Sequence, residues 1–155
     1  MTEETNHAIQ NAQSWIESIK GYVVAMNEAS WERRDELKEG EAILDADGMA
    51  ELAELNAQLS EYEDTDDART QAEESALSIE LTGTWEPGTE PKADGFIILL
   101  TTGGPALRIV GELNEHNEPD RAWMEHQDWG TPWTRCHQAD EDDLLAFASI
   151  FYFGG

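Results

Sequence analysis

Residues 96–113 read FIILLTTGGPALRIVGEL and decide the fold. Phe96–Leu100 is apolar at every position, which predicts a central strand covered by a helix on at least one face. Gly103-Gly104-Pro105 predicts a tight turn. From Ala106 to Leu113 apolar and polar side chains alternate, as they do in a half-solvated strand. The stretch therefore predicts an antiparallel hairpin within a sheet.

One further strand is predicted before this hairpin and another after it. Leu77–Trp85 and Arg121–Gln127 are rich in β-branched and aromatic residues and lie between turn-forming residues. Pro87-Gly88 and Pro91 mark the first connection, and Asn114–Pro119 reads as a polar hairpin loop. Connections this short predict a four-stranded, mainly antiparallel meander.

Helices are predicted in the first half of the chain and at the C-terminus. Apolar residues recur every three or four positions over 6–28, with Asn6 as N-cap, and over 47–62, which predicts helices there. A helix over 30–39 is predicted from Ser30 as its cap and Gly40 at its end, and one over 140–150 from its acidic first turn. Residues 63–74 are polar and predict a loop that enters a helix at Asp66 or Asp67. The fold class is thus α+β, with N-terminal helices packed on the sheet and a C-terminal helix. Residues 1–80 form an acidic helical region and residues 81–155 a β-meander with that helix, together one compact domain.

Charge is the dominant compositional feature. The 155 residues include 34 Asp and Glu against 9 Lys and Arg, a net charge of −25. Such a field repels nucleic acid and anionic lipid, so a direct ligand of either class is not expected. The expected partner is a basic protein.

The remaining composition bears on compartment. Cys136 is the single cysteine, which excludes an internal disulfide framework and fits a reducing compartment. No apolar run exceeds Phe96–Leu100, too short to span a membrane or form a signal-peptide core. We therefore expect a cytoplasmic location without membrane contact.

Candidate catalytic and metal-binding residues are few. His126, Asp128, Cys136 and His137 match no established zinc spacing, and adjacent residues on a strand point to opposite faces. A cysteine nucleophile needs an electropositive setting, which this chain does not supply. Gly103-Gly104-Pro105 lacks the Lys and the following helix of a phosphate-binding loop. The sequence thus predicts no catalytic residue, no metal, no cofactor and no enzyme activity.

The aromatic residues Trp123, Trp129, Trp133 and Tyr152 allow two interpretations. They form either a recognition surface or core packing at a corner of the sheet, and we favour the core. Trp31 is flanked by charges, which predicts an exposed ring.

The acidic residues fall into arrays. At helical spacings of three and four residues, side chains of one face stand about 5–6 Å apart, close to the spacing of DNA phosphates. An expected surface of roughly 7,800 Å² carries about one net charge per 310 Å², against about one per 110 Å² on a duplex, so a DNA-like surface requires clustering. Glu32, Asp35, Glu36 and Glu39 form one array. The candidate phosphate-mimicking residues are Asp47, Glu51, Glu54, Glu61, Glu63, Asp64, Asp66, Asp67, Asp140, Glu141, Asp142 and Asp143.

Three motifs carry a resemblance to known proteins. Residues 108–113 (RIVGEL), 127–133 (QDWGTPW) and 151–154 (FYFG) resemble a family of short, largely uncharacterised proteins encoded by phages and other mobile elements. The resemblance covers roughly the C-terminal half and carries over no functional residue. In size and charge the chain is similar to DNA-mimic inhibitors of restriction enzymes and CRISPR effectors, which implies a bacterial host cytoplasm and a Cas effector or restriction enzyme as partner.

These observations lead to one functional hypothesis and two alternatives. The hypothesis is a phage-encoded DNA mimic that occupies the nucleic-acid site of a host defence nuclease, as a monomer or as a homodimer. One alternative is an acidic adaptor or assembly protein that binds a basic partner. The other is adaptation to high salt, in which the charge carries no function. Competition with DNA separates the first two, and unfolding in dilute buffer marks the third.

Overall fold

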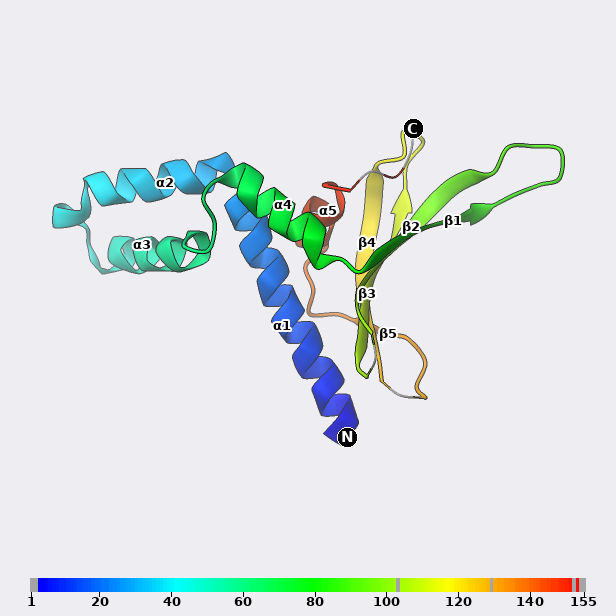
Figure 1. Cartoon of the computed structure of the whole chain (residues 1–155). Coiled ribbons are helices and arrows are strands. Elements are labelled where there is room, and N and C mark those ends of the chain that lie inside the picture. Colours follow the sequence, from blue (N-terminus) through cyan, green and yellow to red (C-terminus); the bar gives the residue numbers. More distant parts are fainter. Residues whose placement is uncertain (1–2, 103, 129, 152, 154–155) are drawn as a thin grey trace.

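A computed structural model describes residues 3–102, 104–128, 130–151 and 153, with the backbone alone for residues 3–7. It forms two layers, with helices on one face of a sheet (Figure 1). The helices are α1 (Glu3–Met26), α2 (Glu28–Glu39), the 3₁₀ turn η1 (Glu41–Ile43), α3 (Ala46–Leu59), α4 (Thr65–Ser75) and α5 (Glu141–Ala148). The strands are β1 (Ser78–Thr84), β2 (Lys92–Thr101), β3 (Ala106–Leu113), β4 (Pro119–Gln127) and β5 (Thr134–Cys136).

The sheet is an antiparallel meander in the order β1-β2-β3-β4-β5. This confirms the α+β class and the antiparallel sheet, but the expected number of four strands was wrong. The missed strand, β5, has three residues and pairs Met124 with Cys136 and His126 with Thr134. Three residues are too few for alternation to be visible in the sequence. The predicted turn at residues 103–105 includes Gly103, which lies outside the described residues.

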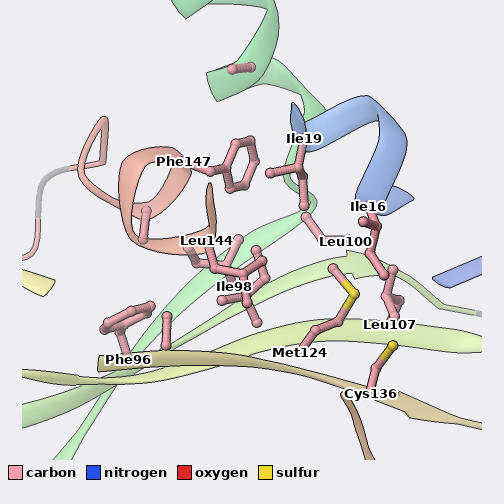
Figure 2. Close-up of a cluster of buried hydrophobic side chains, with 14 of the residues drawn as sticks. Ile16, Ile19, Phe96, Ile98, Leu100, Leu107, Met124, Cys136, Leu144 and Phe147 are labelled. Carbon is pink, nitrogen blue, oxygen red and sulfur yellow. The ribbon is translucent and has the colours of Figure 1, made fainter. Parts of the chain in front are cut away.

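Alternation along the strands separates a core face from an outer face. Phe96, Ile98, Leu107 and Met124 are fully buried on the core face (Figure 2). They meet α1 through residues such as Ile19, and α5 through residues such as Leu144 and Phe147. The predicted helical cover over the central strand is therefore present on this face.

Helix starts differ from the predicted ones because other polar residues cap them. α1 begins at Glu3, so Asn6 lies inside the helix. The Asn27 side chain, not that of Ser30, caps α2 by accepting a hydrogen bond from the Ala29 amide. α4 begins at Thr65 behind its cap Asp64. In both α2 and α4 the N-cap position is occupied by a nearby residue whose capping propensity equals that of the predicted one.

Candidate functional site

The α2–α3 arm, residues 28–59, projects from the C-terminal end of α1 away from the sheet (Figure 1). Leu37 on α2 and Leu52 on α3 are buried within it. A second small cluster of Ala25, Leu59 and Ala68 joins the base of the arm to α1 and α4. The arm thus stands on the body through few side chains and leaves most of its surface to solvent.

The most acidic part of the molecule is the stretch 45–67, which we call the acidic stretch. It contains nine Asp and Glu and no Lys, Arg or His. It forms α3, the following turn and the first residues of α4. Eight of the twelve candidate phosphate-mimicking residues lie in it, so the structure makes them neighbours along one continuous segment.

Glu51 is neutralised by an arginine from the other helix of the arm. Arg33 donates from Nε to Oε2 and from Nη2 to Oε1 of Glu51, both at 2.9 Å, and from Nη1 to Glu36 at 3.4 Å. The hydrogen bonds from Arg33 lower the pKa of Glu51, and those to Glu51 and Glu36 raise the pKa of Arg33. This two-pronged ion pair closes α2 onto α3. Glu51 therefore belongs to the architecture of the arm and is not a free phosphate mimic.

Two more candidate carboxylates are used in capping. Asp64 accepts a hydrogen bond from the amide of Asp67 at 2.8 Å and begins α4. Asp67 Oδ2 accepts from the Glu63 amide at 3.0 Å and from Gln71 Nε2 at 3.1 Å. These two carboxylates hold the turn between α3 and α4, since they satisfy amides at and just before the helix start.

Five candidate carboxylates in the acidic stretch remain unengaged. Within the described part of the chain, the following side chains are exposed and make neither an ion pair nor a hydrogen bond: Asp47, Glu54, Glu61, Glu63 and Asp66. The local field also acts on Tyr62, whose pKa rises to about 12 through burial, Tyr22, and the nearby Glu61 and Asp67. The unengaged set is the part of the predicted site that can meet a cationic partner.

The candidates at the start of α5 belong to another part of the molecule. Asp140 caps α5 by accepting from the Asp142 amide at 2.8 Å. Glu141 Oε2 accepts from the Ala122 amide at 3.2 Å and ties α5 to β4. Asp142 is exposed and Asp143 is half-buried. Asp140 and Glu141 therefore start α5 and tie it to the sheet, whereas the Asp142 side chain is directed to solvent. None of the four residues belongs to the acidic stretch.

We expect Asp143→Asn to increase the free energy of unfolding at pH 7 and to leave it nearly unchanged at about pH 3. Burial and Asp140 raise the pKa of Asp143, Lys20 opposes them, and Asp142 adds to the rise. Because the folded-state pKa lies above the unfolded value of 3.8, the folded state binds the proton more tightly. Stability is thus greatest below the unfolded pKa and falls as the pH rises through the folded pKa.

Urea unfolding at the two pH values measures this difference. Asp94→Asn, at an exposed position on β2, is the control and should change stability little at either pH. A loss of stability in Asp143→Asn at pH 7 would contradict the expected sign.

Trp123 and Trp133 are half-buried and lie with Arg108 and Arg135 on the outer face of the sheet, so the core interpretation was wrong for these two residues. Arg108 lies over the Trp133 ring at 4.0 Å, and Arg135 over the Trp123 ring at 5.3 Å. Glu125 joins them by accepting from Arg108 Nη2 at 2.7 Å and from Trp123 Nε1 at 3.1 Å. The rings and guanidinium groups therefore cover this face with cation–π contacts.

The remaining aromatic candidates have separate outcomes. Trp31 is half-buried and donates from Nε1 to the Ala25 carbonyl at 2.8 Å, so the expectation of an exposed ring was wrong. Trp129 and Tyr152 lie outside the described residues. Trp85, which the sequence pattern did not single out, is 58% exposed near the end of the β1–β2 hairpin.

The weak catalytic candidates do not assemble. Across residues 3–102, 104–128, 130–151 and 153, no group of three or more His, Cys, Asp or Glu side chains is placed to hold a metal ion. Cys136 is buried on β5 with Sγ 3.0 Å from Gln138 Oε1. In the same part of the chain, no helix combines the length and apolarity needed to cross a membrane.

Comparison of the chain with protein-family models, curated proteins and solved structures gave no match.

Proposed function

We propose that this protein is a phage-encoded inhibitor that presents the acidic stretch in place of DNA phosphates and occupies the nucleic-acid site of a bacterial defence nuclease. The observation that carries the proposal is the acidic stretch itself, with nine carboxylates and no basic residue in positions 45–67. Its α3 residues form one side of an arm that projects from the body (Figure 1). A projecting arm has the shape needed to enter a basic groove.

The average charge density of the surface shows that mimicry of DNA would require the carboxylates to be clustered. The accessible surface is 9550 Å², so the net charge of −25 averages about one charge per 380 Å², against about one per 110 Å² on duplex DNA. The surface exceeds the roughly 7,800 Å² expected for this mass because the arm and the β1–β2 hairpin project. An average this dilute does not imitate DNA, whereas the acidic stretch concentrates charge locally.

The two arginines of the arm leave this local field intact. Arg33 is occupied by Glu51 and Glu36, and Arg34 lies against Asp35 and over the Trp31 ring. These two cations are bound within the arm. Lys38, the third basic residue of the arm, is exposed on α2, outside the acidic stretch. A basic groove would then meet the unengaged carboxylates directly, with fast and salt-sensitive association.

The test is inhibition of DNA cleavage by a panel of restriction endonucleases and RNA-guided nucleases at about 0.15 M salt. We expect one or more nucleases to be inhibited, and excess duplex DNA to release the inhibitor. Retention of the complex in the presence of DNA would favour the adaptor alternative, in which the bound surface is not a nucleic-acid site. Inhibition of no nuclease would contradict the proposal.

A charge-matched pair of variants locates the surface. In the acidic-stretch variant, Asp47→Asn is combined with Glu54→Gln, Glu61→Gln and Glu63→Gln. In the control, the same four charges are removed from exposed positions elsewhere, by Glu74→Gln, Glu86→Gln, Glu90→Gln and Glu118→Gln. We expect the first variant to inhibit roughly tenfold more weakly or worse, since each exposed pair contributes about 0.2–1 kcal/mol, and the second to inhibit almost normally. Equal loss in both would show that only net charge matters.

A further inference from the structure

Strand β1 combines an open sheet edge with an uncovered apolar stripe. Leu77, at its entry, and Ile79, Leu81 and Trp85 are 59%, 38%, 51% and 58% exposed, respectively. Ile79 pairs with Ile98 and Leu81 with Phe96, so this side of β1 continues the core face of the sheet. The stripe is therefore the margin of the hydrophobic core, exposed because the described helices end short of it.

Apart from a register shift at Thr82/Gly83, near its far end, the strand carries few of the features that protect an exposed edge. β1 is the outermost strand, so alternate backbone amides and carbonyls face solvent. Ser78–Thr84 contains no Lys and no Pro, and its single charged residue, Glu80, lies on the opposite face from the stripe. Ile150 and Phe151 line a groove beside Leu77 and Ile79, which widens the apolar surface. An edge of this kind favours pairing with another strand.

We propose that β1 pairs antiparallel with β1 of a second copy of this chain, about a twofold axis at Ile79. In this register Leu77 lies opposite Leu81 of the second copy and Ile79 lies opposite Ile79, whereas Trp85 lies beyond the paired segment. Glu80 lies opposite Ser78 of the second copy, which avoids the like-charge pair that a register centred on Glu80 would create. The two five-stranded sheets would then form one continuous sheet.

The surface area that β1 can bury determines the expected affinity of the dimer. Leu77, Ile79 and Leu81 expose on the order of 300 Å² on each copy, which with the strand backbone gives a total of about 800 Å², the size of a weak interface. We therefore expect dissociation in the micromolar range. Two copies of charge −25 repel each other, so added salt should strengthen the dimer, whereas salt weakens binding of a cationic partner to the acidic stretch. This inference does not rest on the proposed function, and the two fail separately.

Sedimentation equilibrium from about 5 to 200 μM protein, in 0.15 M and 0.5 M salt, tests the dimer. We expect a mass approaching twice 17.3 kDa, reached at lower protein concentration in the higher salt. The variant Ile79→Thr/Leu81→Thr keeps β-forming residues on the strand and should raise the dissociation constant at least tenfold. The control Ile43→Thr/Met49→Thr removes two apolar side chains that are 89% and 57% exposed on the arm, and should dimerise like the parent.

Amide hydrogen exchange identifies the strand directly. As the protein concentration rises, amides within residues 78–82 should become protected while those of the arm do not change. If the protein stays monomeric at all concentrations in 0.5 M salt, the proposal is overturned. This holds even if β1 instead binds an extended segment of another protein. A dimer in which β1 amides gain no protection, or in which both double variants weaken equally, overturns it as well.

Discussion

Phe147→Ala should lower the free energy of unfolding by about 3–5 kcal/mol, the usual cost of removing a fully buried aromatic ring. Phe147 is 0% exposed, and its ring lies 6.1 Å from Tyr22 on α1 and 5.5 Å from Phe151. It sits between α5 and α1 above the sheet (Figure 2). Removing the ring leaves a cavity where two helices and the sheet meet. Urea unfolding followed by circular dichroism measures the loss.

The matched control is Ile43→Ala at the tip of the arm. Ile43 is 89% exposed, so its truncation should change stability by less than about 0.5 kcal/mol. A loss below about 1 kcal/mol for Phe147→Ala would show that α5 does not seal the core.

Gly111→Ala should cost about 2–3 kcal/mol, although it adds only one methyl group. A Cβ at Gly111 would lie 2.2 Å from Cζ of Phe96 and 2.4 Å from the Arg121 carbonyl oxygen. The Phe96 ring therefore occupies the space that a side chain would need, and that ring is itself packed against Phe153 at 4.8 Å. Neither the ring nor the neighbouring strand can move without disturbing the core. Thermal and urea unfolding measure the effect.

Gly21→Ala is the informative control because it makes the same change where there is room. A Cβ at Gly21 meets nothing within 4 Å, and the position is inside α1. Alanine there should stabilise the protein by about 0.5–1 kcal/mol through helix propensity. Destabilisation by both substitutions to a similar degree would contradict the contact between Phe96 and Gly111.

The fold was predictable where the alternation of apolar and polar residues extended over a whole strand. β3 occupies Ala106–Leu113 as expected from its alternation. β2 begins at Lys92 rather than Phe96, because pairing with β1 extends the strand through polar residues. β5 could not be identified, since pairing with β4 defines it and three residues carry no period.

The candidate site was predictable in position but not in the role of each carboxylate. The sequence places nine acids in positions 45–67, and this clustering is independent of tertiary structure. The pairing of Glu51 with Arg33, 18 residues away, depends on how α2 packs on α3. Likewise, capping by Asp64 depends on where α4 begins, which several neighbouring polar residues could equally mark.

The position of Trp123 follows from parity along its strand. Trp123 lies between Ala122 and Met124, both buried, and alternates with them along β4. A residue between two core-facing residues of a strand points to the other face. Arg121 and Glu125 share its parity and mark that face as the polar one. For this residue, place in the alternation is a better guide than aromatic character.

The meander order of the sheet has a consequence for synthesis on the ribosome. Each strand pairs with the one made just before it, so the sheet can form by successive local hairpins. The apolar face of α1, by contrast, waits for β2–β4 and α5, which follow about 70 or more residues later. During that interval the nascent chain exposes Ile16 and Ile19 within residues 1–80, whose 21 acidic and 5 basic residues repel other chains. Acidity in this half thus also protects an unfinished core from aggregation while its second layer is still being translated.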